Sequence, residues 1–405
     1  MNYSTTLNQP AAILVERQRI SSIDLVRGIV MVIMALDHVR DFYHVVAYSY
    51  NTTDMSTTTP ALFFTRWITH FCAPTFVFLA GTSIFLSTRR KSKKELSRFL
   101  LSRGLWLILL EIVVVRFAFF FNFYYDLTIL QVIWAIGASM VCMAGLIHLS
   151  QKIVLTIGLI IVFGHNITDA WQLQPTDSGY VIWALLRQTG FIQVSAQISV
   201  LAFYPLLPWL GIMILGYCLG QLYGRDFDPA RRRKILLQLG LGATTLFIIL
   251  RFLNVYGDPA AWSEQKNALF TFMSFLNTTK YPVSLLYALM TLGPVLMLLS
   301  WLEKKELAFL KPLIVFGRVP LFYFVIHFLL IHFTALLFFM NKTGTSFGGL
   351  DFHINKGFGG LTGENGYSLF WVYVAWIAIV VALYPLCRWY NKYKDTHRNW
   401  WLSYL

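Results

Sequence analysis

The sequence SIDLVRGIVMVIMALDHVRDFY, residues 22–43, is long enough and apolar enough to cross a bilayer as a helix. It nevertheless contains six ionisable side chains, and each charge placed in hydrocarbon costs several kcal/mol. These side chains are Asp24, Arg27, Asp37, His38, Arg40 and Asp41. Because protein or water must surround them, the stretch predicts a helix inside a membrane protein, not a lipid-facing anchor.

The helical period places several of these charges on one face. Arg27 and His38 are eleven positions apart, so at roughly 100° per residue their directions differ by only about 20°. Along the helix axis they are about 16 Å apart, and Asp24 and Asp41 fall on the same stripe. Apolar residues lie between the two polar ends. The helix is therefore expected to form one wall of a buried channel.

The rest of the chain is equally apolar. Of its 405 residues, 57% are hydrophobic and only 13% are charged, which excludes a water-soluble domain and predicts an all-α, polytopic helical membrane protein. An eleventh span at residues 180–203 is left open, because Arg187 and three glutamines favour an amphipathic or re-entrant helix there. About ten other apolar runs predict transmembrane helices, at residues 22–46, 61–87, 99–121, 127–149, 153–167, 204–223, 235–256, 281–301, 313–340 and 368–389.

The distribution of Lys and Arg predicts the orientation. Most of them lie in the tails and the alternate loops that share a side with the N-terminus, above all at residues 89–94 and 231–234. The positive-inside rule therefore places both termini in the cytoplasm. The expected organisation is a disordered N-terminus at 1–19, a transmembrane domain at 20–390 and a cytoplasmic tail at 391–405.

Several classes of function are excluded. The basic clusters, which supply most of the net charge of +14, lie at membrane edges, so nucleic-acid binding has no support. They are expected to rest on anionic lipid headgroups as topology determinants, and the alternative is that they attract an anionic substrate. The four cysteines fall inside spans with no pairing pattern, so neither a disulfide framework nor a metal site is expected. The chemistry is therefore expected within the membrane region.

Two further histidines lie at a depth comparable to that of His38, on different predicted helices. His70 precedes Pro74 by four residues, so Pro74 cannot donate to the His70 carbonyl, which is left for another partner. His327 lies deep in the outer half of the ninth span. Three histidines at one level favour a functional site, although each alone is more often a packing residue. Glu111, deep in the third span, is expected to pair with an arginine of another helix.

The two ends of the channel suit different chemistry. Arg27 and Arg318 lie on the cytoplasmic side, and guanidinium groups suit phosphate by geometry and permanent charge. Histidine suits proton abstraction near neutral pH, and Asp37 or Asp41 would raise the basicity of His38. A phosphate-bearing donor with a long thin arm, such as acyl-coenzyme A, fits this layout.

Five motifs carry a resemblance to a known family: SSIDLVRGIVMVIMALDHVRDFYH, HFCAPTFVFLAGTSIFLS, YPLLPWLGIMILGY, FGRVPLFYFVIH and RNWWLSYL. Together they resemble the bacterial branch of the heparan-α-glucosaminide N-acetyltransferase catalytic-domain family, within the transmembrane acyltransferase superfamily. The resemblance implies transfer of acetyl from cytoplasmic acetyl-coenzyme A to a glycan hydroxyl or amine outside. It also implies that Arg27 and His38 take the superfamily's first-helix arginine and histidine.

This chain departs from the lysosomal members of that family. The resemblance implies that those members have asparagine at the position of His38 and an active histidine in the first luminal loop. The corresponding loop here, residues 48–59, contains no histidine. His38 is therefore expected to be the general base or a transient acyl carrier.

Two hypotheses follow. The first is an acyltransferase of the bacterial inner membrane that uses acetyl-coenzyme A, needs no metal and modifies a glycan of the cell envelope. The alternative is a proton-coupled transporter or exporter, because buried Asp and His residues also form proton relays. Inverted repeats, which many transporters contain, are not evident in the sequence. Whether the protein is a homo-oligomer stays open.

Overall fold

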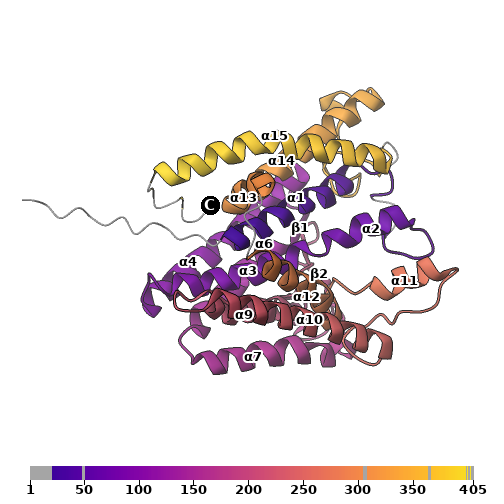
Figure 1. Ribbon diagram of the computed structural model, residues 1–405. Coiled ribbons are helices and arrows are strands. Elements are labelled where there is room, and N and C mark those ends of the chain that lie inside the picture. Colours follow the sequence, from indigo (N-terminus) through magenta and orange to yellow (C-terminus); the bar gives the residue numbers. More distant parts are fainter. Residues whose placement is uncertain are drawn as a thin grey trace, which may run out of the picture.

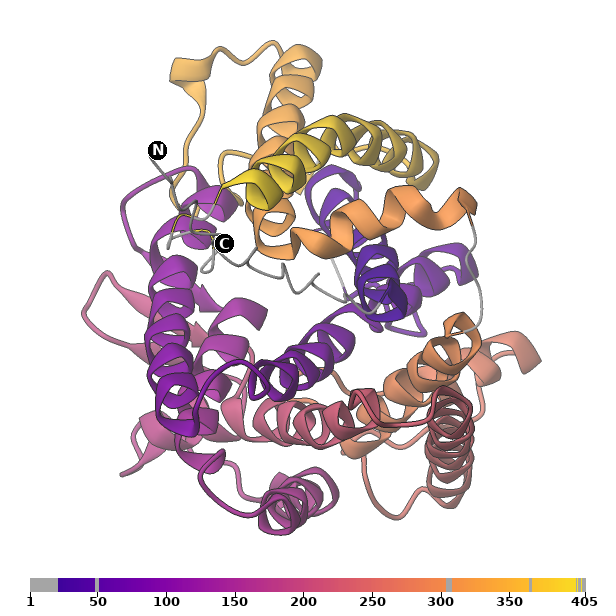
Figure 2. The same cartoon turned by 60° about the vertical axis from the view of Figure 1, so that its left-hand side comes forward.

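The computed structural model describes residues 21–47, 51–303, 308–363, 366–397, 399 and 402. Helices pack side by side into one bundle (Figure 1 and Figure 2), which confirms the predicted all-α membrane fold. The predicted disordered segment at 1–19 lies outside the described residues. The α-helices are α1 (Ser21–Tyr43), α2 (Pro60–Thr69), α3 (Cys72–Ser87), α4 (Lys93–Leu110), α5 (Arg116–Phe120), α6 (Val132–Leu146), α7 (Gln151–Gly164), α8 (Tyr180–Leu186), α9 (Leu206–Leu219), α10 (Pro229–Leu253), α11 (Ala268–Leu276), α12 (Leu285–Leu302), α13 (Lys311–Arg318), α14 (Pro320–Thr343) and α15 (Leu369–Thr396).

Short turns extend several of these helices. A π-helical turn, η1 (Glu111–Val115), joins α4 to α5. The 3₁₀ turns are η2 (His165–Ala170), η3 (Gly220–Tyr223), η4 (Ala308–Leu310) and η5 (Phe347–Gly349). The last helix, α15, continues past residue 390 into the segment predicted as a cytoplasmic tail.

Seven helical segments of the described chain are long enough and apolar enough to cross a membrane. The segments at α9 and α12 are mostly buried inside the bundle. Those at α7, α10 and α15 are apolar but mostly not buried, as expected of lipid-facing helices. The other predicted spans fall on α1, on α4 with α5, and on α6. The seven segments are Pro60–Ser87, Gln151–Ala170, Leu206–Tyr223, Pro229–Leu253, Leu285–Leu302, Pro320–Thr343 and Leu369–Thr396.

The prediction of a single amphipathic or spanning helix at residues 180–203 is wrong. Only α8 is helical there, and the remainder forms β2 (Gly190–Gln193) and β3 (Ser199–Ala202). In a three-stranded sheet, β3 pairs antiparallel with β2 and parallel with β1 (Leu127–Leu130), which occupies the start of the predicted fourth span. Residues 194–198 connect the two strands, and the Val194 N–H donates to the Ile198 carbonyl at 2.9 Å. The chain therefore reverses direction there and does not continue as a helix.

Helix α1 is the interior helix that its charges predict. It packs against α2, α3, α12, α13, α14 and α15. The contact with α13 is close enough that a Cβ added at Gly28 would overlap the carbonyl oxygen of Leu313, and one at Gly317 would overlap that of Asp24. Only glycine allows two helix backbones to approach this closely.

Two predicted spans are each broken into two helices next to a proline. Val319 separates α13 from α14, and Pro320 begins the second helix. His70 and Phe71 separate α2 from α3, close to Pro74. The carbonyl that Pro74 leaves without a donor accepts a hydrogen bond from the Tyr287 hydroxyl, at 2.7 Å. The predicted free carbonyl is thus used to join α12 to the break.

The predicted pairing of Glu111 with an arginine of another helix is wrong. Its Oε2 atom accepts a hydrogen bond from the backbone N–H of Trp134, at 2.8 Å, in the first turn of α6. Arg116 pairs instead with Asp126, at 3.1 Å. Glu111 therefore satisfies a backbone donor that the start of a helix leaves without a partner.

Replacing Glu111 with alanine is expected to destabilise the protein by about 1–3 kcal/mol, because a buried N–H of α6 loses its acceptor. Thermal unfolding of the purified protein in detergent measures the loss. Glu111→Gln keeps an acceptor oxygen at the same place and is the control, with a smaller expected loss. Equal stability of both variants and wild type would contradict this account of the cap.

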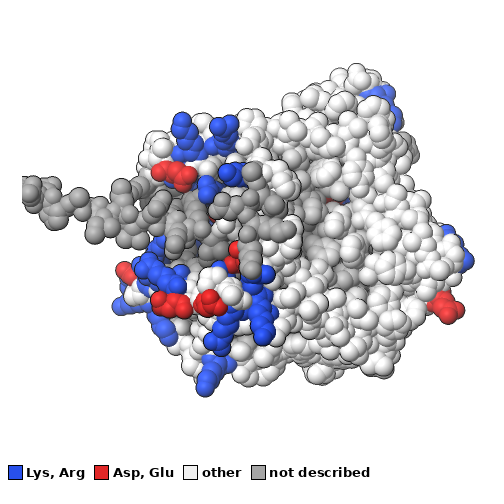
Figure 3. Space-filling view, in the orientation of Figure 1, with Lys and Arg blue, Asp and Glu red and all other residues white. Residues whose placement is uncertain are grey.

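Charged side chains gather at one end of the bundle (Figure 3). The α3–α4 loop, the α9–α10 loop and the end of α15 lie there, and residues near the start of α1 and the end of α15 line the same cavity. The surface toward the opposite end is mostly uncharged in this view. The sequence predicts that the basic end faces the cytoplasm.

Candidate functional site

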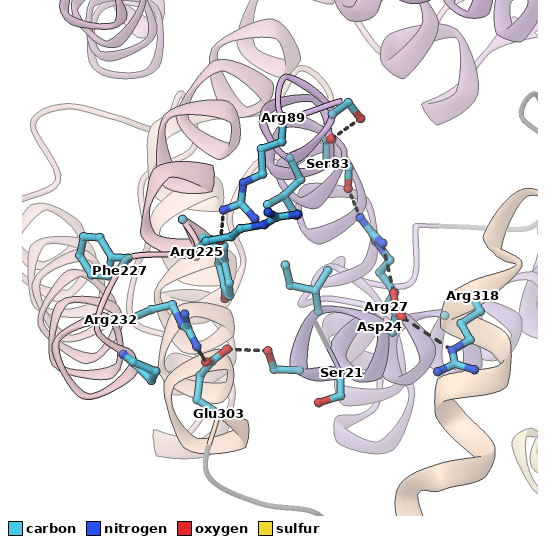
Figure 4. Close-up of a pocket in the computed structure, with 18 of the residues that line it drawn as sticks. Ser21, Asp24, Arg27, Ser83, Arg89, Arg225, Phe227, Arg232, Glu303 and Arg318 are labelled. Atoms are coloured by element: carbon cyan, nitrogen blue, oxygen red, sulfur yellow. Dashed lines mark hydrogen bonds and ion pairs between the residues drawn. The ribbon is translucent and has the colours of Figure 1, made fainter. Parts of the chain in front are cut away.

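A cavity of about 1020 Å³ opens at the basic end of the bundle, and we call it the vestibule. Figure 4 shows its arginines around a central space, contributed by α1, α13, the start of α10 and the loops after α3 and α9. Two carboxylates, Asp24 and Glu303, also line it. The cationic side chains are Arg27, Arg89, Arg90, Arg225, Arg232, Arg318 and Lys394.

The three residues predicted at the anion-binding end meet in this vestibule. Arg27 donates to the Leu79 carbonyl at 3.0 Å and to the Ser83 hydroxyl, which fixes its direction. Asp24 lies between two guanidinium groups, 3.5 Å from Arg27 Nη1 and 3.8 Å from Arg318 Nε. The backbone contact between α1 and α13 brings the two arginines together.

Other vestibule residues are absent from the predicted site. Arg232 reaches Glu303 at 2.7 Å, and Glu303 also accepts from Ser22 at 2.5 Å, which joins the starts of α1 and α10 to the end of α12. Partial burial, followed by repulsion from Arg225, lowers the pKa of the Arg89 guanidinium from its ordinary value. Arg89 and Arg232 belong to basic runs that the sequence presents as topology signals, with the attraction of an anionic substrate as the alternative. Nothing in the spacing of these arginines or of Arg225 shows that they converge.

A second cavity, of about 350 Å³, continues from the vestibule, and we call it the tunnel. Arg27, Ser83 and Pro320 line both cavities, so the two cavities adjoin at the Arg27 guanidinium. Beyond that point the tunnel walls are mainly apolar side chains of α1, α3, α4, α6 and α14.

A third cavity, of about 190 Å³, is the outer cavity. It shares Phe76, Val132 and Phe324 with the tunnel, and His38 and Asp37 are among its polar lining residues. Vestibule, tunnel and outer cavity therefore follow one another along α1, from its guanidinium to its imidazole.

His38 lies against α14. Its ring centre is 5.2 Å from that of His327 and 4.1 Å from that of Phe328. His327 is fully buried, and its Nδ1 donates to the Tyr323 carbonyl at 3.1 Å, which leaves its Nε2 as an acceptor without a described partner. His38 Nδ1 is 3.8 Å from Asp41 Oδ2, too far for a hydrogen bond.

The carboxylates beside His38 are held by arginines. Asp37 accepts from Arg40 at 2.9 Å and from Arg66, and Asp41 accepts from Arg40 at 2.6 Å. Arg40 comes from α1 and Arg66 from α2. Arg66 is absent from the predicted site, because its place in a separate predicted span gives no sign of the Asp37 contact.

His70 is not part of this group. It is buried beside Tyr287, with ring centres 5.4 Å apart, and lines none of the three cavities. The structure thus brings together His38, Asp37, Asp41 and His327 at the outer end. Among the described residues, no group of three His, Cys, Asp or Glu side chains is placed to hold a metal ion.

The helical bundle and its internal site define a multi-pass membrane protein with a passage along one buried helix. The model of the family described as heparan-alpha-glucosaminide N-acetyltransferase, catalytic, matches residues 19–253. The chain belongs to this family of membrane acetyltransferases, which confirms the family that its motifs resemble. A comparison with curated proteins finds no match.

The matched region contains only part of the site. Arg27 and His38 lie inside it, whereas Arg318 and His327 lie beyond its last residue. Both ends of the passage are therefore completed by the C-terminal part of the chain.

Proposed function

We propose that this protein transfers an acetyl group from cytoplasmic acetyl-coenzyme A to a hydroxyl or amine of a cell-envelope glycan, across the bacterial inner membrane. The observation that carries the proposal is the series of three adjoining cavities along α1, from Arg27 to His38. The series has a polyanion-binding character at one end and a proton acceptor at the other. Membership of an acetyltransferase family supports the same chemistry.

The donor fits the passage by charge and shape. Its phosphates would bind the vestibule arginines, whose repulsion an anionic ligand relieves. Its thin pantetheine arm would occupy the mainly apolar tunnel. Arg27 and His38 are eleven positions and about 16 Å apart along α1, which sets the distance that the arm must bridge.

The chemistry would take place in the outer cavity. The acceptor oxygen or nitrogen attacks the thioester carbonyl while His38 takes its proton, and the carbon–sulfur bond then breaks. The coenzyme A thiolate leaves and receives the proton from His38, so the reaction is balanced without another reagent. His327, in ring contact with His38, would fix the orientation of that imidazole.

Purified protein in lipid nanodiscs tests the proposal. Supplied with isotopically labelled acetyl-coenzyme A and a glycan extract of the envelope, it is expected to release coenzyme A and label the glycan, as measured by mass spectrometry. Absence of both coenzyme binding and label transfer would contradict it. Substrate uptake by proteoliposomes at a rate that does not depend on the acyl donor would instead indicate a proton-coupled transporter.

Arg27→Ala is expected to raise the KM for acetyl-coenzyme A by about 10- to 100-fold, because the donor loses a charge-assisted hydrogen bond. Steady-state kinetics with varied donor concentration measures the change. Arg98→Ala removes an exposed arginine of α4 that lines none of the cavities, and it should leave the KM unchanged. Equal KM values for both variants would show that Arg27 does not bind the donor.

A further inference from the structure

The outer cavity contains a lysine that neither the sequence analysis nor the proposed mechanism uses. Lys280 lines this cavity together with His38 and Arg66, and only 9% of the surface of Lys280 is exposed. Its Nζ is 5.0 Å from the ring centre of Tyr281, which also lines the cavity. Among the described residues, none forms an ion pair with Lys280, although it lies beside a site that contains two carboxylates.

Those carboxylates are already engaged. Asp37 binds Arg40 and Arg66, and Asp41 binds Arg40, at the distances given above. Leaving the histidines aside, the group has three cationic and two anionic side chains, and Lys280 is the cation outside the ion pairs. A buried excess of positive charge is costly, so an anion entering the cavity would be stabilised there.

The segment that carries Lys280 is held in place from both sides. Asp258 accepts from the Thr279 backbone at 2.8 Å, the Thr279 hydroxyl at 2.7 Å and the Ser284 hydroxyl at 2.7 Å. Arg251, at the end of α10, donates to the carbonyls of Ser274 and Asn277 at 3.0 and 2.8 Å. Such anchoring pre-organises a binding group, because little freedom remains to be lost on binding.

The neighbouring tyrosine adds a second polar group to the same wall. Tyr281 stacks on Phe203 with ring centres 3.8 Å apart, and its hydroxyl lies 3.4 Å from Arg66 Nη2. Lys280, Tyr281 and Arg66 therefore present an ammonium, a phenol and a guanidinium to one small space. This combination suits a carboxylate or phosphate group.

We propose that Lys280 and Tyr281, beside Arg66, form a subsite for an oxyanion group of the acyl acceptor, either a carboxylate or a phosphate. The inference rests on the proposed acetyl transfer and names its acceptor class: an acidic sugar. With its anionic group at Lys280, such a sugar places a neighbouring hydroxyl or amine at His38. The outer cavity, of about 190 Å³, accommodates the part of one sugar unit that carries the anionic group and the neighbouring hydroxyl or amine.

Three matched acceptors test the subsite: glucose, glucuronic acid and glucose 6-phosphate. The wild-type protein in nanodiscs receives acetyl-coenzyme A with each sugar, and mass spectrometry measures the acetylated product. The kcat/KM is expected to be about 10- to 100-fold higher for at least one acidic sugar than for glucose. The better of the two acidic sugars distinguishes a carboxylate from a phosphate subsite.

Variants connect the preference to this side chain. Lys280→Met should lose the preference, so that kcat/KM for the acidic sugars falls to that for glucose in the same variant, and Lys280→Arg should keep most of it. Lys266→Met is the matched control, because Lys266 is an exposed lysine that lines none of the described cavities. A preference that survives in Lys280→Met, or equal transfer to all three sugars, overturns the inference.

A binding measurement separates this inference from the proposed function. Glucuronate or glucose 6-phosphate is expected to raise the Tm of the wild-type protein but not that of Lys280→Met. If this shift occurs but neither the three sugars nor the envelope extract is acetylated and acetyl-coenzyme A does not bind, the anion subsite stands and the transferase assignment fails. If acetyl transfer occurs without any shift or charge preference, the subsite fails and the transferase assignment stands.

Discussion

His38→Ala is expected to lower kcat for acetyl transfer by about 10²- to 10⁴-fold, the usual contribution of a positioned general base. His38 is the imidazole that lines the outer cavity, and the ring of His327 contacts the ring of His38. Because the variant removes a proton acceptor and leaves the vestibule intact, the KM for acetyl-coenzyme A should change little. Stopped-time assays of coenzyme A release, together with the Tm of the variant, measure both effects.

The matched control for this prediction is His353→Gln. His353 is half exposed, stacks on Tyr124 and lines none of the three cavities, so its loss should leave kcat near the wild-type value. Comparable activity of the His38 variant and wild type, with both folded, would remove His38 from the chemistry. A folded His327→Ala variant should show an intermediate loss, because it affects only the orientation of His38.

Gly28→Val is expected to destabilise the protein by more than about 4 kcal/mol, the range of exceptional single substitutions. A Cβ at this position overlaps the Leu313 carbonyl, which belongs to backbone and cannot rotate away as a side chain can. Helix α13 would have to move off α1, which would separate Arg318 from Asp24. Yield of monodisperse protein and thermal unfolding in detergent measure the effect.

Gly242→Val on α10 is the control for that substitution. Nothing lies within 4 Å of a Cβ built at Gly242, so the same change of residue meets open space. Its Tm should stay close to that of wild type. If the Gly28 variant is as stable as the Gly242 variant, close backbone packing does not hold α1 against α13.

The C-terminal part of the chain adds residues at every level of the passage. Glu303 and Arg318 line the vestibule, Phe324 lines the tunnel and Lys280 lines the outer cavity, all beyond the region that matches the family. The acceptor side of the proposed reaction therefore depends on a segment outside that region. Comparison of the three sugars above addresses this segment directly.

Several features could be predicted from the sequence because they depend on local composition and period. Apolar runs of membrane length predict the helices, and the charges of residues 22–43 predict that α1 is buried. The eleven-residue spacing predicts that Arg27 and His38 share a face, and both line the cavity series. Pro74 correctly indicates that the His70 carbonyl is left for another partner, because a proline removes a specific backbone donor.

Two expectations that rest on hydrophobicity and charge are wrong. Residues 180–203 have the hydrophobicity of a span, but beyond Leu186 the chain forms two strands joined by a reversal at residues 194–198. Glu111 has the depth of a buried ion-pair partner, but its neighbour is the start of α6 and not an arginine. In both cases hydrophobicity and charge gave the depth of a residue without giving the group that it contacts.

The membrane class, the buried first helix and the face that carries Arg27 and His38 follow from composition and helical period alone. The contacts of Arg318 with Asp24 and of Arg66 with Asp37, and the place of Lys280 in the outer cavity, follow from the packing of the helices. These contacts join segments far apart in the chain, and helix packing sets which of them meet. No local period encodes that choice.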